Sequence, residues 1–418
     1  MNNRETMKPH GSEPRFYYGY VVVLVAFLIM LVLWGVYYAF GIFFKPMLNE
    51  FGWTRAMTSG AYSLGQITTG MLVIVMGGLN DRVGPRVVMS VCGVFLGVGY
   101  LMMSQIHSLW QLYLFYGVII GAGMSGSFIP IISTVARWFV GRRGIMTGFV
   151  AAGVGAGALI GPPVANLLIS NYGWRISYLI LGVIVLAVIV LSAQLLKRDP
   201  TEVGQIPYAN NRGEPEASYP EEDDVSLHEA LFTGRFWVFY GTGFSYGFCL
   251  FSIMVHISPH AIDIGISAAR AAKILAIIGA SSIVGKVFMG RIADIIGSRL
   301  VLMCGFALMS VALIGLIPAR MVWVLYSAAV IFGFGYGSVA VSHSPLVANL
   351  FGLRAHGLIF GAFGTSVQLG GAVGPFMTGY IFDTSGGYSP AFAVCAVVAF
   401  FAIVLASVLK KKGVGVSV

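Results

Sequence analysis

The stretch GGLNDRVGPR at residues 77–86 recurs 213 residues later as GRIADIIGSR at residues 290–299, and this repeat decides the fold. Two glycines, an aspartate and an arginine match in register, and they pair Gly77, Asp81, Gly84 and Arg86 with Gly290, Asp294, Gly297 and Arg299. The same offset relates further residues: Trp110 and Tyr113 to Trp323 and Tyr326, and Gly144, Gly148, Gly161 and Pro162 to Gly357, Gly361, Gly374 and Pro375. Matches in one register on several separate segments indicate a chain built from two duplicated halves.

The composition excludes a soluble domain. Hydrophobic residues make up 57% of the 418 residues and charged residues only 10%, against about 25% charged in an average soluble domain. The apolar content excludes a disordered chain, and four cysteines in this length exclude a disulfide scaffold. Nucleic-acid binding is not predicted, because the net charge of +9 is not gathered in a basic patch on an exposed domain. The class that remains is a polytopic membrane protein.

Apolar runs of about 20 residues, long enough to cross the hydrocarbon core of a bilayer, recur along almost the whole chain. The runs are too long and too uniformly apolar for the alternating strands of about ten residues that build a β-barrel. The twelve predicted helices are 17–44, 54–79, 86–106, 109–136, 144–169, 175–196, 235–261, 268–290, 299–318, 321–349, 357–381 and 388–409. We therefore predict an all-α membrane protein of two pseudo-symmetric six-helix bundles.

The distribution of Lys and Arg predicts the topology. Of the 25 basic residues, 18 lie in tails and loops on the side of the N-terminus, six lie on the other side, and Lys286 lies within a span. The positive-inside rule then places both termini in the cytoplasm. The predicted organisation is a tail at 1–16, a bundle at 17–197, a linker at 198–233, a bundle at 234–409 and a tail at 410–418. The acidic run at 221–224 is interpreted as a solvated part of the linker.

The repeated segment resembles the cytoplasmic signature between the second and third helices of the major facilitator superfamily, and the resemblance extends over essentially all twelve helices. It implies two six-helix halves that rock about a central site, as the transporters of this superfamily do. Charged residues of the signature are the predicted cytoplasmic gate: Asp81, Arg82, Arg86, Asp294 and Arg299. A mere tight turn would explain the glycines and arginines but not the paired aspartates.

A narrower resemblance lies at 138–157, WFVGRRGIMTGFVAAGVGAG, which is similar to the fifth-helix signature of monocarboxylate transporters and of their bacterial relatives, the oxalate–formate antiporters. The segments 17–27 and 40–56 also fit bacterial members of that group. Glycines on this helix are expected to form a small-residue face that packs closely on a neighbouring helix, namely Gly144, Gly148, Gly153, Gly155 and Gly157.

Lys286, within the predicted eighth helix, is the candidate substrate-binding cation. A charge inside a span costs about 2.5–3.5 kcal/mol on insertion scales and by default indicates function. Its counterpart in the repeat is Val73, so packing symmetry does not require a cation. The alternative is snorkelling of the lysine stem to the membrane interface, but we favour function. Monocarboxylate transporters typically carry Arg at this position, and the resemblance implies that Lys286 binds the substrate carboxylate.

The proton-coupling residue is left open by the sequence. The vertebrate carriers place an Asp one turn before their Arg, where this chain has Ser282, and the first-helix lysine of those carriers is absent. Either Lys286 itself exchanges a proton, or the protein exchanges one anion for another. His256 and His260, one turn apart, are further candidates, with satisfied packing histidines as the alternative. No metal is predicted, because the acidic partner of an HExxH motif is missing.

Uncharged polar residues within the spans complete the candidate substrate site: Ser282, Tyr38, Tyr336, Gln66, Ser366 and Gln368. Each of them alone is weak evidence, since polar side chains also join helices to one another. His343, in the predicted tenth helix, ranks below His256.

The predicted function is secondary active transport of small monocarboxylates such as lactate and pyruvate, by alternating access and with proton symport favoured. The alternatives are an exchanger of organic anions without proton coupling, and a transporter-like membrane sensor. An enzyme is not predicted, because no nucleophile, base and metal-ligand cluster occurs, and no cofactor is implied. The expected partners are a carboxylate, a proton in the symport case, and the lipid bilayer. We expect a monomeric multi-pass protein of the cell membrane, namely the bacterial inner membrane.

Overall fold

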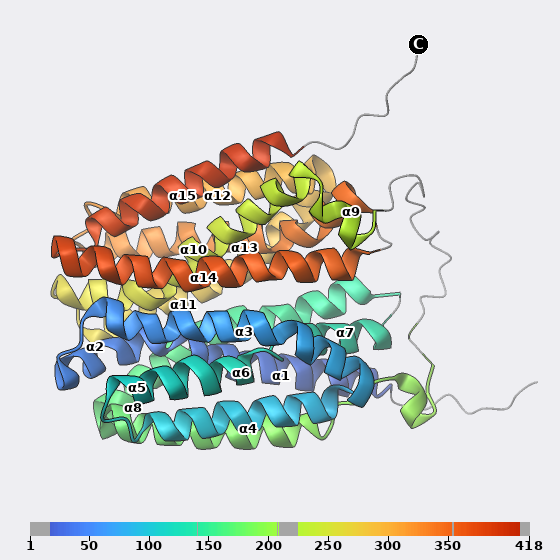
Figure 1. Ribbon diagram of the computed structural model, residues 1–418, viewed down its shortest axis with the longest axis horizontal. Helices are drawn as coiled ribbons and strands as arrows, with labels where there is room; N and C mark the ends of the chain where they lie inside the picture. The colour runs from blue at the N-terminus through green and yellow to red at the C-terminus, as the bar shows by residue number, and fades with distance from the viewer. Residues whose placement is uncertain (1–16, 140, 207, 209–224, 353–354, 410–418) are drawn as a thin grey trace, which may run out of the picture.

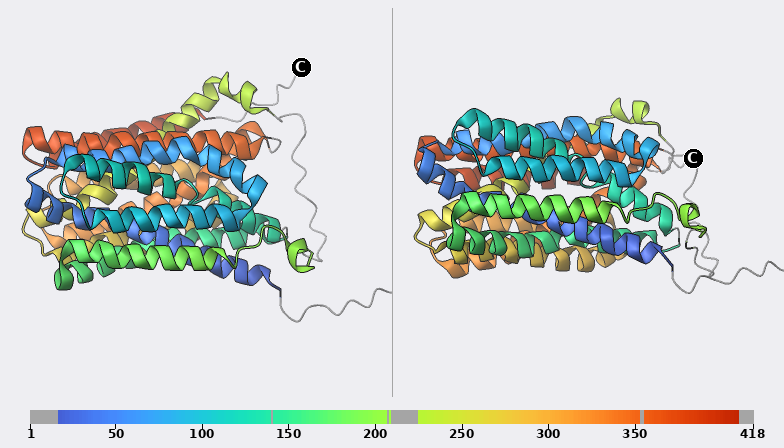
Figure 2. Two further views of the ribbon diagram at one scale, coloured as in Figure 1. Left: turned by 60° about the horizontal axis from the view of Figure 1, so that its bottom comes forward. Right: turned by 90° about the horizontal axis from the view of Figure 1, so that it is seen from below.

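The computed structural model describes residues 17–139, 141–206, 208, 225–352 and 355–409. Both predicted tails and the acidic run at 221–224 therefore lie outside the described residues, as do residues 207 and 209–224 of the predicted linker. Two helical layers run along a common long axis, with the N-terminal half in one layer and the C-terminal half in the other (Figures 1 and 2).

In the N-terminal half, helices follow one another with short connections: α1 Gly19–Tyr38, α2 Phe40–Phe51, α3 Arg55–Val83, α4 Pro85–Met103, α5 Leu109–Leu112, the π-helix η1 Tyr113–Ile120, α6 Gly121–Met124, α7 Ile129–Trp138 and α8 Arg143–Ala193. Within the predicted linker lie a short 3₁₀ helix η2 Pro200–Val203 and helix α9 Leu227–Leu231. The C-terminal half contains α10 Gly234–Asp263, α11 Ala268–Ile296, α12 Ser298–Leu316, α13 Val322–Phe351, α14 His356–Ser385 and α15 Ser389–Val408.

Twelve spans are confirmed among the described residues. Eleven helical segments are long and apolar enough to cross a membrane, and one of them, Arg143–Ala193, has 51 residues. Gly173 interrupts that segment, because its φ of 75° and ψ of 164° lie outside the helical region. The segment therefore consists of two spans. Helices of this kind satisfy their backbone hydrogen-bonding groups internally, as a segment inside a lipid bilayer must. The chain is therefore a multi-pass membrane protein.

The repeated motif has a structural reason at its glycines. Gly84 and Gly297, which correspond in the two halves, have φ of 84° and 88°. Other residues rarely adopt such a backbone, and here it turns the chain sharply from α3 into α4 and from α11 into α12. The predicted ends of the spans differ from the ends of the observed helices by up to seven residues. The first span extends to Phe51 rather than to residue 44, whereas α4 ends at Met103, before the predicted residue 106.

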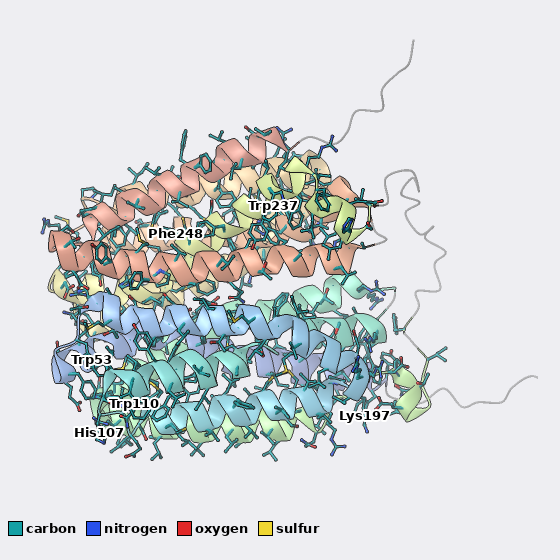
Figure 3. All side chains as sticks on the ribbon, in the orientation of Figure 1. Trp53, His107, Trp110, Lys197, Trp237 and Phe248 are labelled. Carbon is teal, nitrogen blue, oxygen red and sulfur yellow. The ribbon has the colours of Figure 1, made fainter. Side chains whose placement is uncertain are left out.

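The two ends of the bundle differ in what they carry. Helix α1 begins and α15 ends at the end where Lys197 and α9 lie, which we call the linker end (Figures 1 and 3). Trp53, His107 and Trp110 lie at the opposite end, which we call the distal end, while Trp237 and Phe248 mark the C-terminal half (Figure 3). The halves meet mainly along two pairs of helices, α3 with α14 and α8 with α11.

Close packing between helices depends on glycine. A Cβ atom on Gly161 would lie 2.1 Å from the carbonyl oxygen of Gly35, so α8 packs against α1 backbone to backbone. The predicted small-residue face is occupied only in part: Gly153, Gly155 and Gly157 touch neighbouring helices, whereas a Cβ on Gly144 or Gly148 would meet nothing within 4 Å. The two open glycines lie toward the linker end of α8.

Candidate functional site

Lys286 lies half-buried on α11, with Nζ 5.3 Å from the centroid of the Tyr336 ring. Helix α13 holds that ring in place by approaching α11 closely, because a Cβ on Gly337 would lie 3.0 Å from the Lys286 backbone nitrogen. Among the described residues no carboxylate pairs with the ammonium group. The ring face attracts the cation without neutralising it, so Lys286 remains available to an anion.

Two further tyrosines extend from Tyr336. The rings of Tyr246 on α10 and Tyr336 stack with centroids 6.0 Å apart, and the Tyr38 hydroxyl on α1 interacts with the hydroxyls of both. We call Lys286, Tyr336, Tyr246 and Tyr38 the central cluster. It joins a side chain of the N-terminal half to three of the C-terminal half, which is what a site between two moving halves requires.

His343, which the sequence analysis ranks below His256, adjoins this cluster. Its ring packs edge-on against Tyr246 at 5.5 Å and lies 4.5 Å from the ring of Phe363. The side chain is 3% exposed, and Nε2 has no hydrogen-bond partner. A signal was present, because Tyr336 and His343 are seven residues apart and thus share one face of α13.

Four other predicted substrate contacts bond to their own helices or have an unpaired polar atom elsewhere. Ser282 and Ser366 donate to carbonyl groups of their own helices, Gly279 at 2.8 Å and Phe363 at 2.6 Å. Gln66 and Gln368 lie where α3 meets α14, and Gln66 Nε2 and Gln368 Oε1 are buried without partners. None of the hydrogen bonds of the described residues joins these four side chains to Lys286.

The distal end holds an ionic network that joins the halves, and the sequence reasoning did not find it. Asp263 of α10 pairs with Lys45 and, at 2.6 Å, with Arg55. Asp383 accepts from the Arg55 backbone at 3.0 Å, and the Tyr388 hydroxyl accepts from Arg55 Nη1 at 2.6 Å. We call Lys45, Arg55, Asp263, Asp383 and Tyr388 the distal gate. Opposite charges at one end were visible in the sequence, but their pairing depends on how the halves meet.

His256 and His260 adjoin the distal gate through Tyr388. His256 Nε2 lies 2.8 Å from the Pro375 carbonyl oxygen, which can only accept, so that nitrogen carries the proton. The other nitrogen, 3.1 Å from the Tyr388 hydroxyl, then accepts from it. Burial raises the pKa of the Tyr388 hydroxyl, which keeps its proton available for this bond. His260 packs edge-on against Tyr388 at 5.6 Å. Neither histidine contacts the central cluster.

At the linker end, the polar contacts of the predicted gate residues stay within one half. Asp81 pairs with Arg137 at 2.6 Å, and Arg86 donates to Gln194 at 2.7 Å. Arg299 donates to the carbonyls of Ala406 and Ser407. Arg82 and Asp294 are exposed.

Glycines between the two halves are also packed more tightly toward the distal end than toward the linker end. A Cβ on Gly279 would lie 2.6 Å from the Leu159 backbone nitrogen, and one on Gly379 2.7 Å from the Ser59 hydroxyl. By contrast, a Cβ on Gly290 or Gly361, nearer the linker end, would meet nothing within 4 Å. The halves are thus joined at the distal end, and their facing helices are more loosely packed toward the linker end. Within the described part of the chain, no three His, Cys, Asp or Glu side chains are grouped to hold a metal ion.

Comparisons with known proteins agree with this architecture. The family model described as Major Facilitator Superfamily matches residues 23–288 and 261–415. Monocarboxylate transporter 11 of Mus musculus is 28% identical over 405 residues, which cover 94% of this chain and 87% of that protein. The oxalate:formate antiporter of Oxalobacter formigenes is 24% identical over 415 residues, covering 97% and 94%. These relatives are transporters and not enzymes.

Among solved structures, the chain resembles a bacterial homologue of the human lysosomal transporter Spinster in an inward-facing, unoccupied conformation. The TM-score is 0.74 at 15% identity, and the match covers 95% of this chain and 97% of the other. At this identity the likeness establishes the fold alone.

Proposed function

This chain is a transporter that belongs to the Major Facilitator Superfamily, and we propose that it carries small monocarboxylates of the lactate and pyruvate type together with a proton. The proposal includes cytoplasmic placement of the linker end, with 17–197 and 234–409 moving as two bundles about the linker 198–233. In that orientation the structure is inward-facing, because the distal gate is closed.

The position of the Lys286 ammonium group carries the proposal. Lys286 lies ten residues, about 15 Å, from the linker end of α11. The Tyr336 ring lies at this level, because Gly337, the next residue on α13, packs against the Lys286 backbone. The ammonium group therefore contacts a ring within the bundle, which argues against snorkelling toward the interface. A cation held at that depth without a counter-ion fits the binding of an anion.

One cation favours a monoanion over a dianion. In the described spans, with Gly173 taken as the boundary between the fifth and the sixth, Lys286 is the one Lys or Arg that lies more than about two turns from either end of its span. A second carboxylate, as in oxalate, would be buried without a cation, and an unpaired buried charge is costly. The names of the monocarboxylate transporter relatives point to the same substrate class.

Transport by alternating access requires the distal gate to open and the linker end to close. Closure would bring together the predicted cytoplasmic gate residues of the two halves, among them Asp81 and Asp294, and would bury the open faces of Gly148 and Gly290. Tyr38 and Tyr336 would then stay beside the substrate on opposite halves.

Uptake of radiolabelled lactate and pyruvate into proteoliposomes tests the proposal. We expect accumulation when the outside is made acidic, and loss of at least tenfold of the uptake in Lys286→Gln. Lys273→Gln, an exposed lysine on the same helix, is the matched control and should transport normally. Equal uptake by Lys286→Gln and the unaltered protein would show that the charge has no part in binding. Exchange of lactate without any response to the gradient would favour the anion exchanger.

A further inference from the structure

His343 is a buried titratable group that the transport mechanism above leaves unused. His256 has both ring nitrogens hydrogen-bonded. His260 Nε2 is unpaired as well, but its ring packs on Tyr388 of the distal gate and not on the central cluster. His343 is 3% exposed, and its Nε2 has no partner. Buried polar groups are almost always satisfied, so an unpaired nitrogen here requires an explanation.

The surroundings of His343 lead toward Lys286. Its ring contacts Tyr246, Tyr246 stacks on Tyr336, and Tyr336 lies beneath the Lys286 ammonium group. The histidine therefore lies two aromatic rings from the proposed carboxylate site. Both Tyr336 and His343 project from one face of α13, which fixes their spacing.

The groups packed against His343 provide no compensating negative charge. Helix α10 presents Tyr246 and Phe239, and helix α14 presents Phe363. The charged group that these contacts reach is Lys286 on α11, by way of Tyr246 and Tyr336. In the part of the chain that the structure describes, no carboxylate contacts the imidazole. An imidazolium would thus be unpaired in the empty site and would gain an anionic neighbour when a carboxylate binds.

We propose that His343 takes up the proton that crosses the membrane with the substrate. This inference rests on the proposed function, since it names the proton site of that symport. A proton from solution binds the imidazole as the carboxylate binds Lys286, and both leave together on the other side.

The charge balance of the site supports this assignment. The empty site has a net charge of +1 from Lys286, and the loaded site also has +1, from Lys286, protonated His343 and one carboxylate. The loaded and empty forms then differ by a neutral pair, so the halves move the same charge in both directions. If Lys286 exchanged the proton instead, its replacement by arginine, which does not deprotonate, would abolish coupling.

The test uses the full-length protein in proteoliposomes with radiolabelled lactate. The readout is the ratio of initial uptake with an acid-outside gradient to uptake without one, together with lactate–lactate exchange at equal pH. We expect His343→Gln to keep measurable exchange while its ratio falls to about 1, since glutamine cannot carry the proton. Lys286→Arg should keep a ratio well above 1. His107→Gln, an exposed loop histidine, is the control and should keep the ratio of the unaltered protein.

Each outcome decides the matter. A ratio for His343→Gln equal to that of the unaltered protein overturns the proposal while leaving symport intact. An unaltered protein with a ratio of 1 overturns both symport and the role of His343. If His343→Gln shows no exchange because it fails to fold, His343→Asn is measured in its place: a ratio of about 1 supports His343, and the ratio of the unaltered protein overturns the proposal. A ratio of 1 in Lys286→Arg also overturns it, because it assigns the proton to Lys286.

Discussion

The distal gate gives the sharpest prediction, because one carboxylate, Asp263, pairs with two cations of the other half. We consider Asp263→Asn, which keeps the size of the side chain and removes its charge. In the closed structure this change weakens the contacts to Lys45 and Arg55. When the distal end opens, both contacts are lost in any case. The substitution therefore destabilises only the distal-closed state.

The magnitude follows from the exposure of the partners. The side chains of Asp263 and Lys45 are 21% and 22% exposed, so we assign about 1 kcal/mol to this pair, as for partly screened ion pairs. Arg55 is 9% exposed and bonds Asp263 at 2.6 Å, and a hydrogen bond to a charged group contributes about 2 kcal/mol. Losing about 3 kcal/mol shifts the closed-to-open equilibrium by about 100-fold.

Cysteine labelling measures this shift. Ser59 is fully buried beneath the distal gate, at the contact of α3 with Gly379, so Ser59→Cys reports opening at that end. The background is Cys304→Ser, which removes the exposed native thiol. We expect Asp263→Asn to accelerate labelling by a membrane-impermeant maleimide by about 100-fold, unless labelling of the open state becomes limiting.

A matched control separates the gate from general loosening. Glu50 pairs with Arg175 at 2.6 Å at the same end of the bundle, but both residues belong to the N-terminal half. Glu50→Gln should leave the labelling rate unchanged. Identical rates for Asp263→Asn and Glu50→Gln would refute the view that the distal network holds the two halves together.

Two further predictions concern the same contacts. Tyr388→Phe removes the acceptor of Arg55 Nη1 and the donor to His256. Ser59→Cys labelling should then rise about 30-fold, as expected for the loss of about 2 kcal/mol from a bond to a charged group. An unchanged rate would assign the tyrosine to packing alone. Gly279→Ala places a methyl group 2.6 Å from a backbone nitrogen of α8 and should therefore lower the melting temperature. Gly290→Ala, which has open space around it, should leave the melting temperature unchanged. Equal melting temperatures of the two variants would contradict the close contact between α8 and α11.

The fold was predictable because its physical causes act locally along the chain. Runs of about 20 apolar residues form helices in lipid regardless of their neighbours. The repeat at 77–86 and 290–299 predicted duplicated halves, and the positive φ of Gly84 and Gly297 explains why both copies keep glycine there. The sixth span needed the break at Gly173, which the predicted end of the fifth helix at 169 anticipated to within a few residues.

The candidate site was predictable only where composition alone marks a residue. Lys286 stands out in any reading, because a charge within an apolar run is costly. Ser282 and Ser366 looked equally available in the sequence, but a serine hydroxyl in a helix can donate to its own backbone, and both do so. His256 and His343 could not be separated by sequence either, since their roles depend on which helices surround them.

The sequence by itself determined the number of spans, the duplication, the superfamily and the one cation in the interior of a span, because hydropathy and covalent order act along the chain. Only the tertiary structure decided which charges meet. Arg55 and Asp263 are separated by 208 residues and nevertheless form an ion pair at 2.6 Å, while Asp81 and Asp294, identical in the repeat, lie at the end where the facing helices are loosely packed. The reason is that ion pairs and ring contacts act over a few ångströms, so they depend on how two bundles lie against each other and not on the order of residues within either.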